Sequence, residues 1–476
     1  MTSERDLSPS ASYSLTLRVQ MPQRPRAFAA VAGAIGDTGA ILGAIDLVRV
    51  EPGGVVRDVT VACADAAHGE AVVAAVKALD GVSVHSVSDR TFLLHLGGKI
   101  EVVSKVPIKT RDDLSMAYTP GVARVSMAIR EDPEKAWTLT IKSNTVAVVS
   151  DGSAVLGLGN IGPEAAMPVM EGKAMLFKEL AGVDAFPLCI ATQNVDEIVA
   201  FVTAAAPTFG GVNLEDIAAP RCFEIERRLA AELDIPVFHD DQHGTAIVVL
   251  AALLNALRVV GKDPGEIRVV VVGAGAAGIA CARMILAHGV RNVVVSDVDG
   301  VLYPARPGLD PERAAFAALT NPEDRRGMAG EMLAGADVLI GVSGPGAVTA
   351  EAVRAMAPGA IVFAMANPEP EVHPEEIRDD VAIIATGRSD YPNQINNVLA
   401  FPGVFRGALD VRATAITEGM KLAAARAIAG VIEDDELHAE YIVPSVFHPR
   451  IAEAVASEVA EAAVREGVVR KPRVSG

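Results

Sequence analysis

The sequence is poor in cysteine and in basic residues, and each shortage argues against a class of protein. Four cysteines lie far apart with no CxxC spacing, which favours reduced thiols in a core over disulfides or a zinc site. With 42 Lys and Arg against 60 Asp and Glu, the net charge is −18, so nucleic acids and anionic membrane surfaces are poor partners. No apolar run reaches about 18 residues without interruption, and the N-terminus has no apolar signal core. These absences predict a cytoplasmic protein with no membrane partner.

Apolar residues, in contrast, are plentiful. The 476 residues are 50% hydrophobic and 21% charged, with a mean hydropathy of +0.33, which is typical of a well-packed globular protein. That length supports two or three domains, each with its own core. Changes in pattern divide the chain into residues 1–96, 97–242 and 243–476. The last helices, from Ala413 on, are expected to pack back on the middle domain.

The first domain alternates strands and helices in the order βαββαβ. Strand-like and helix-like runs follow one another at residues 13–19, 27–36, 41–50, 55–63, 66–79 and 82–96. Glu51-Pro-Gly-Gly is the predicted hairpin turn between the middle strands, and Gly39 follows the first helix where a left-handed residue is expected. The order predicts a ferredoxin-like domain.

This domain resembles the ACT domain. The resemblance implies a module that pairs with a copy of itself and binds a small effector, often an amino acid. ACT domains usually carry a Pro-Gly turn after the first strand, whereas the turn from Pro22 to Arg26 has no glycine. Two roles therefore stay open: binding a small-molecule effector, or only joining chains into a homodimer or a larger homo-oligomer.

Acidic side chains are concentrated between residues 213 and 246. Glu215 and Asp216 precede a helix-like run, and the short apolar strand after it ends in Asp240 and Asp241. Carboxylates at the ends of two strands can build the all-oxygen cage that a hard divalent cation such as Mg²⁺ or Mn²⁺ prefers. The alternative is that these acids only cap helices.

A glycine-dense loop precedes an apolar helix that carries one lysine. Four glycines between Asp151 and Gly162 allow the backbone to approach a ligand closely. Lys173 opens the next helix, where the helix dipole, partial burial and a nearby cation would lower its pKa from about 10.4 toward neutrality. Such a lysine could act as a general base, and a solvated lysine is the ordinary alternative. Tyr118, in a turn before another helix, is either surface packing or a second site residue.

The third domain carries a dinucleotide fingerprint between a strand and a helix. The apolar run 267–272 is followed at once by Gly273, Ala274, Gly275, Ala276, Ala277 and Gly278. A pyrophosphate is therefore expected over the helix N-terminus. The next strand ends in Asp297, 19 residues beyond Gly278, where a carboxylate would bind the ribose hydroxyls. Asp299 adds a second negative charge that would repel the 2′-phosphate of NADP, so NAD is the predicted cofactor.

Several long motifs in order resemble the malic enzyme family in its short bacterial form. They are SKVPIKTRDDLSMAYTPGVA, SDGSAVLGLGNIGPEAAMPVMEGKAMLFKELAGVDAFP, the acidic stretch and the dinucleotide segment, which cover nearly everything from about residue 100 onward. The resemblance implies a general acid at Tyr118 and a general base at Lys173. It implies metal ligands at Glu215, Asp216 and Asp241.

The same resemblance assigns roles to two asparagines in loops. Asn367 and Asn397 match family positions that contact substrate and nicotinamide. One departure is Ala154, because animal members of the family carry a substrate-binding arginine in this stretch. How the second carboxylate of malate is held is therefore open.

These features predict the oxidative decarboxylation of (S)-malate to pyruvate and CO₂ with reduction of NAD. The reaction needs a base for the hydroxyl, a hydride acceptor, a Lewis acid to accept electron density and an acid for the enolate. One alternative is a decarboxylating dehydrogenase of another 2-hydroxy diacid. A second is a dinucleotide-sensing regulatory protein without catalytic activity.

Overall fold

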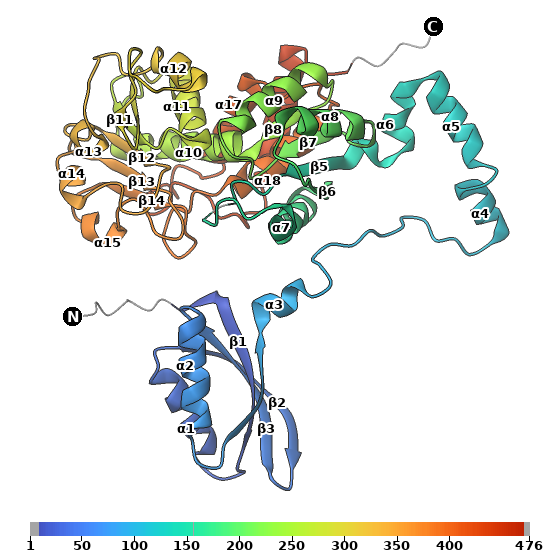
Figure 1. Ribbon diagram of the computed structural model, residues 1–476, viewed down its shortest axis with the longest axis vertical. Helices are drawn as coiled ribbons and strands as arrows, with labels where there is room; N and C mark the ends of the chain where they lie inside the picture. The colour runs from blue at the N-terminus through green and yellow to red at the C-terminus, as the bar shows by residue number, and fades with distance from the viewer. Residues whose placement is uncertain (1–8, 156, 471–476) are drawn as a thin grey trace. The chain divides into compact units, whose positions relative to one another are not determined.

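The computed structural model describes residues 9–155 and 157–470, and the chain divides into two compact units. The first unit is Met1–Glu101 and the second is Val102–Gly476 (Figure 1). Strands and helices are mixed in both, so the predicted α/β class is confirmed.

The first unit is a four-stranded antiparallel sheet with three helices. Its elements are β1 (Ser10–Met21), α1 (Ala27–Gly36), β2 (Ile41–Glu51), β3 (Gly54–Cys63), α2 (Ala66–Lys77), β4 (Ser83–Asp89) and α3 (Arg90–His95). The strand order is β2-β3-β1-β4, which is the ferredoxin-like arrangement predicted from the element order. Leu17, Val31, Val59 and Val72 form part of its core.

The end of this unit differs from the expected extended segment 82–96. β4 stops at Asp89, whose side chain accepts hydrogen bonds from the backbone N–H groups of Thr91 and Phe92. That N-cap starts α3, so a short helix replaces the second half of the predicted strand. The periodicity of apolar residues gave no sign of this cap.

The second unit contains one parallel sheet and one sheet that is parallel except for an edge strand. The smaller has the order β6-β5-β7-β8, from β5 (Thr145–Ser150), β6 (Asp184–Cys189), β7 (Gly211–Leu214) and β8 (Val237–His239). Pro187 is tolerated in β6 because that strand lies at the sheet edge. Three helices connect these strands: α7 (Pro163–Ala181), α8 (Val195–Ala205) and α9 (Arg221–Glu232).

The larger sheet is a dinucleotide-binding fold with the order β11-β10-β9-β12-β13-β14. Its strands are β9 (Arg268–Val272), β10 (Asn292–Asp297), β11 (Gly300–Val301), β12 (Val338–Gly341), β13 (Ile361–Ala364) and β14 (Ile383–Thr386). All are parallel except β11, which pairs antiparallel with β10. The helices around it are α11 (Ala276–His288), α12 (Pro311–Ala317), α13 (Ala329–Met332), α14 (Ala350–Arg354) and α15 (Pro374–Ile377).

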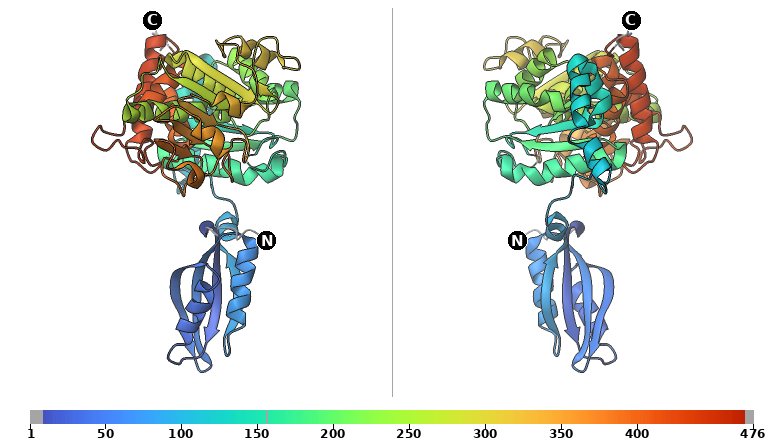
Figure 2. Two further views of the ribbon diagram at one scale, coloured as in Figure 1. Left: turned by 90° about the vertical axis from the view of Figure 1, so that its left-hand side faces the viewer. Right: turned by 90° about the vertical axis from the view of Figure 1, so that its right-hand side faces the viewer.

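One long helix, α10 (Asp240–Val260), joins the two sheets and lies at the centre of the core. Among the described residues it is the one helix long and apolar enough to cross a membrane, and 67% of that apolar span is buried inside the unit. The C-terminal helices are α16 (Phe401–Asp410), α17 (Glu418–Ala429) and α18 (Ile451–Glu466), on one side of the unit (Figure 2). α16 and α18 both contact α7.

The second unit begins with a helical segment that the core does not bury. It contains α4 (Arg111–Ala117) and α5 (Val122–Glu131), followed by the short helices η1 (Pro133–Lys135), α6 (Ala136–Leu139) and η2 (Ile141–Asn144). We call residues 102–131 the arm. None of its residues is buried. In Figure 1, α4 and α5 stand away from the two sheets.

Candidate metal and dinucleotide site

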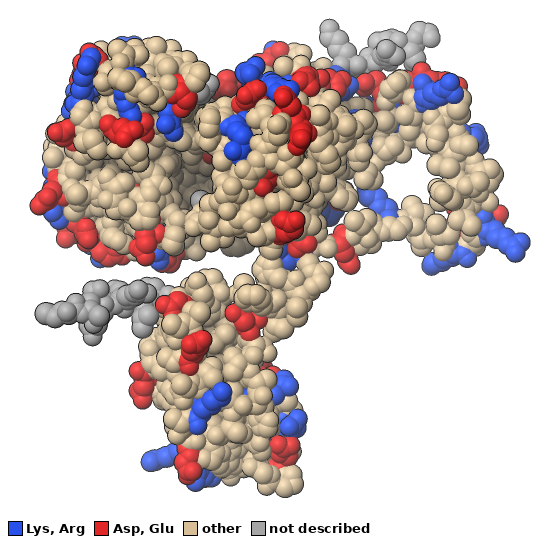
Figure 3. Space-filling view, viewed as in Figure 1, with Lys and Arg blue, Asp and Glu red and all other residues tan. Residues whose placement is uncertain are grey.

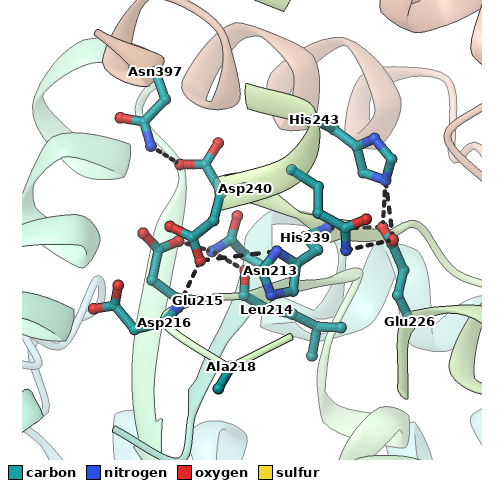
Figure 4. Close-up of polar contacts among 12 residues, drawn as sticks. Asn213, Leu214, Glu215, Asp216, Ala218, Glu226, His239, Asp240, His243 and Asn397 are labelled. Carbon is teal, nitrogen blue, oxygen red and sulfur yellow. Dashed lines mark hydrogen bonds and ion pairs between the residues drawn. The ribbon is translucent and has the colours of Figure 1, made fainter. Parts of the chain in front are cut away.

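Three carboxylates meet at the carboxyl edge of the smaller sheet. Glu215 and Asp216 directly follow β7, and Asp241 is in the first turn of α10, directly after β8. Because β7 and β8 are parallel neighbours, their ends bring these side chains together, and Figure 4 shows Glu215 and Asp216 close to Asp240. One oxygen of each of the three carboxylates lies within 4.8 Å of the others, and the Asp216 N–H donates a 2.8 Å hydrogen bond to Asp241 Oδ2.

This cluster has the properties of a cation site. Glu215 and Asp216 are 5% and 4% exposed, and Asp216 Oδ2 has no hydrogen-bond partner among the described residues. Burial and the charges of neighbouring carboxylates raise the pKa of Asp216 and of Asp241, and burial does the same for Glu215. Oxygen-only ligands suit Mg²⁺ or Mn²⁺, so the residues present fit the expected metal.

Lys173 lies beside the cluster, but not where the sequence placed it. α7 begins at Pro163, directly after Gly162, so Lys173 is in the middle of the helix and not in its first turn. It is 7% exposed, and its Nζ contacts Glu215 Oε1 at 2.9 Å and Asp240 Oδ2. The ammonium also lies 3.9 Å from the centre of a phenyl ring, that of Phe401.

The pKa of Lys173 moves in the opposite direction from the sequence-based expectation. Burial lowers this pKa, but the charges of Asp240 and Glu215 outweigh burial and raise it above the ordinary value. The helix-dipole argument failed because it assumed a first-turn position and could not include partners from distant parts of the chain. Lys173 is therefore a buried ammonium between two carboxylates.

Asp240, which the sequence analysis counted among the strand-end acids but not among the metal ligands that the family resemblance implies, lies beside Lys173. It is fully buried, and its Oδ2 accepts hydrogen bonds from Lys173 Nζ and, at 2.5 Å, from Asn397 Nδ2. Burial raises its pKa to about 7 despite Lys173. The sequence cue for this second role was the adjacent pair Asp240 and Asp241, because successive residues at the start of a helix point in different directions. Asp241 faces the carboxylate cluster, and Asp240 faces Lys173.

The dinucleotide fingerprint has the predicted geometry. Gly273 follows β9 with a left-handed φ of 117°, and α11 begins at Ala276. A Cβ at Gly278 would lie 1.7 Å from the Gly273 carbonyl oxygen, so the first turn of α11 can pack here only with glycine. The N–H groups at the start of α11 are then free to face a pyrophosphate.

Asp297 ends β10 as predicted, but it is not an isolated negative charge. Arg306 Nη2 donates to Asp297 Oδ1 at 2.6 Å, and Arg313 Nη1 lies 3.9 Å from Asp297 Oδ2. The Asp299 side chain is 81% exposed. The predicted repulsion of a 2′-phosphate therefore rests on Asp297 alone, and two nearby guanidinium groups weaken it.

The glycine-dense loop connects the metal cluster with the larger sheet. The Ala154 N–H donates to the Asp216 carbonyl oxygen at 2.9 Å, so the position without arginine lies beside the cluster. Farther along the loop, an atom at the Cβ position of Gly157 would be 3.5 Å from the Asn367 carbonyl oxygen. Asn367 thus lies near the glycine-dense loop, whereas Asn397, at the start of a short 3-10 helix, contacts Asp240.

Arg221, which the sequence analysis did not single out, contacts the start of this loop through its guanidinium. Its Nη2 lies 3.1 Å from Asp151 Oδ2 and 3.0 Å from Ser153 Oγ.

Tyr118 is not at this site. It lies at the C-terminal end of α4, on the arm, and is 67% exposed. The fold therefore gathers Lys173, the three carboxylates and Asn397, and leaves the predicted acid outside.

Comparison with known proteins agrees with this architecture. Residues 97–230 match the family described as malic enzyme, N-terminal domain, and residues 242–464 match malic enzyme, NAD binding domain. The chain is 58% identical to the NAD-dependent malic enzyme of Geobacillus stearothermophilus over 98% of this chain and 97% of that protein. It is 56% identical to the bifunctional malic/malolactic enzyme of Bacillus subtilis over 78% of this chain and 92% of that protein.

Solved structures give the same result. The malic enzyme from Pyrococcus horikoshii has a TM-score of 0.76 and 52% identity, covering 79% of this chain and 89% of that one. The NAD-dependent malic enzyme from Thermotoga maritima has a TM-score of 0.76 and 48% identity, covering 78% of this chain and 99% of that one. By sequence and by fold, the chain belongs to the malic enzyme family.

Proposed function

We propose that this protein oxidises and decarboxylates malate to pyruvate and CO₂ while reducing NAD. The observation that carries the proposal is the buried lysine beside three converging carboxylates, next to a dinucleotide-binding fold. The NAD-dependent relative at 58% identity supports the same activity.

Lys173 is the proposed base for the malate hydroxyl. Because its pKa is raised, Lys173 must first pass a proton on, and Asp240 Oδ2 is the hydrogen-bonded acceptor. Asn397 holds the same oxygen, which orients Asp240 toward the lysine. Loss of the hydroxyl proton then lets C2 transfer a hydride to the dinucleotide.

Glu215, Asp216 and Asp241 are the proposed metal ligands. A bound Mg²⁺ or Mn²⁺ would act there as a Lewis acid that stabilises negative charge on the substrate oxygens. Decarboxylation leaves an enolate that must be protonated on carbon, and Tyr118 is the proposed acid for that step. Asn367 is the proposed contact to substrate and nicotinamide, beside the glycine-dense loop.

The main alternative keeps the chemistry and changes the substrate. Ala154 lies beside the carboxylate cluster, where animal relatives carry arginine, so the pocket for the second carboxylate differs from theirs. A different 2-hydroxy diacid is therefore the second candidate.

For the first unit we propose a role in assembly and regulation. Its ferredoxin-like sheet leaves apolar side chains of β2 exposed, among them Ile41, Leu47 and Val50, each more than half exposed. A second copy of the unit would cover such a surface, and the ACT-like pattern adds a small effector. The proposed domain limits remain 1–96, 97–242 and 243–476, in a cytoplasmic homo-oligomer.

The first experiment is an assay of NAD reduction with malate and Mn²⁺, followed by detection of pyruvate. Activity with malate that disappears in a chelator and returns with Mn²⁺ supports the proposal. Activity with another 2-hydroxy diacid and none with malate would favour the alternative. No dinucleotide reduction with any diacid would contradict both.

A further inference from the structure

The first turn of α10 is held from behind by one acid, Glu226 of α9. Its Oε1 accepts a 2.9 Å hydrogen bond from the His239 N–H, the backbone group directly before the helix. Its Oε2 accepts from Gln242 Nε2 at 3.2 Å and lies 3.0 Å from His243 Nε2. One carboxylate from a neighbouring helix thus contacts three residues of this turn.

This contact supplies the cap that α10 lacks. The N-cap residue, His239, makes no side-chain cap hydrogen bond, although the first N–H groups of a helix need acceptors. In a capping box, the acid that accepts from the N-cap N–H stands three residues further along the same helix. Here that position is Gln242, which donates to Glu226. The acid of the cap therefore comes from α9.

Two residues of α17 extend this network. Lys421 Nζ lies 3.1 Å from His243 Nδ1, the nearer of the two ring nitrogens, and 2.8 Å from Glu418 Oε1. An ammonium can only donate, so His243 Nδ1 accepts and its Nε2 carries the proton that is donated to Glu226. Lys421 is 6% exposed. Hydrogen bonds thus fix the orientation of Glu226 from α17 as well as from α10.

The network is not sealed inside the core. Glu226, Gln242, His243 and Lys421 line a cavity of about 850 Å³ between α9, α10, α11 and α17. Acidic and basic side chains lie close together over α9 on the surface of the unit (Figure 3). Filling space is therefore not the role of Glu226, because water could enter a polar cavity of this size in place of a shortened side chain.

The other side of the same turn carries the site. Asp241 Oδ2 accepts from the Asp216 N–H, and Asp240 Oδ2 accepts from Lys173 Nζ. Figure 4 shows Asp240 and Glu226 on opposite sides of the start of α10. The carboxylates of the cluster repel one another. A restraint on the far side of the turn opposes that repulsion.

We infer that Glu226 is a positioning residue, which acts through the first turn of α10 to keep Asp241 at the metal cluster and Asp240 on Lys173. This inference rests on the metal ligands and the base of the proposed function. Loss of the restraint should weaken metal binding because Asp241 moves. It should also slow the oxidation of malate at saturating metal, because Asp240 moves with the same turn.

Glu226→Ala and Glu226→Gln test this role in the full-length protein. Alanine removes both acceptor oxygens, whereas glutamine keeps one oxygen for the His239 N–H and loses the charge. The affinity for Mn²⁺ without malate, measured from the electron paramagnetic resonance of unbound Mn²⁺, should fall about 10- to 100-fold in Glu226→Ala and less in Glu226→Gln. The kcat at saturating Mn²⁺ should also fall, whereas the KM for NAD should stay unchanged.

Amide hydrogen exchange of the metal-free protein gives a readout that needs neither metal nor turnover. In Glu226→Ala, residues 237–243 should exchange about tenfold faster than in the wild type, because the cap of α10 is lost. Residues 267–272 of the larger sheet should exchange as before. If Glu226→Ala does not fold, Glu226→Gln decides by the same two measurements.

Glu224→Gln is the matched control. Glu224 lies on the same helix and lines the same cavity, but it is 51% exposed and pairs with Arg228 at 3.5 Å. This variant should bind Mn²⁺ and exchange like the wild type. Unchanged Mn²⁺ affinity together with unchanged exchange in Glu226→Ala would overturn the inference, and so would an equal effect of Glu224→Gln. A wild type that binds no Mn²⁺ would contradict the proposed metal site instead, and the exchange comparison would still decide the role of Glu226.

Discussion

The two residues that resemblance to the family pairs as base and acid have opposite environments. Lys173 is 7% exposed and held by two carboxylates, whereas Tyr118 is 67% exposed on an arm without a buried residue. A catalytic group works best when its surroundings fix it before the substrate arrives. For Lys173 the surroundings are the chain's own core. For Tyr118, in its proposed role as the acid, the arm itself supplies no such surroundings.

The largest expected effect on activity comes from changing the carboxylate cluster beside the buried Lys173. Asp241→Asn removes one negative ligand but keeps an oxygen that can accept the Asp216 N–H. We expect malate-dependent NAD reduction to be abolished and the fold to be kept, because the carboxylates of this cluster repel one another. Thermal unfolding with and without Mn²⁺ is the second measurement: Mn²⁺ should raise the Tm of the wild type and not of the variant. Full activity of Asp241→Asn in a chelator would refute the metal assignment.

Lys173→Met should reduce the oxidation of malate by about 10²- to 10⁴-fold, the usual contribution of a general base. Methionine keeps the volume and removes the charge. Lys178→Met is the matched control, because Lys178 lies on the same helix, is 58% exposed and pairs with Asp184. Pre-steady-state NADH formation is the measurement. Equal rates for the two variants would mean that burial of Lys173 serves stability alone.

Tyr118→Phe tests the exposed side, and its effect should be confined to proton transfer. We expect exchange of the pyruvate methyl protons with solvent deuterium to slow by about 10²-fold or more. Oxidation of malate should fall less. Tyr13→Phe is the control, since Tyr13 is a half-exposed tyrosine of the first unit. Unchanged exchange in Tyr118→Phe would show that the arm carries no acid.

Cofactor choice should shift by a smaller factor. Replacing Asp297 by Ser and Asp299 by Lys leaves Arg306 without its carboxylate partner and free to meet a 2′-phosphate. Removing an unfavourable contact of about 1.4 kcal/mol should raise kcat/KM for NADP relative to NAD about tenfold. Asp299→Lys alone should change little, because that side chain is 81% exposed. A wild-type preference for NADP would show that Arg306 and Arg313 already outweigh Asp297.

The smallest effect on turnover is expected from deleting residues 1–96. The first unit has its own core and sheet, so the active site should keep its geometry. If the unit senses an effector, the truncated protein should lose its response to amino acids or acyl-coenzyme A at unchanged malate turnover. A change in oligomeric state alone, measured by light scattering, would leave assembly as its role.

Local patterns were sufficient for much of this protein. The apolar run 267–272, the glycine spacing after it and Asp297 predicted a strand, a tight turn and a helix, because each depends on neighbours in the chain. The sequence also predicted that the carboxylates at the ends of β7 and β8 lie together, because neighbouring parallel strands end at the same edge of a sheet. The order βαββαβ likewise determined the first sheet.

Tertiary structure decided what depends on residues far apart in sequence. The raised pKa of Lys173 comes from Glu215 and Asp240, which lie 42 and 67 residues further along the chain. Arg306 came to lie against Asp297 because β11 turns the chain back on β10. Charge and burial act through space. No local pattern of residues could therefore give the direction in which the pKa of Lys173 moves, or show that the Tyr118 side chain is exposed to water.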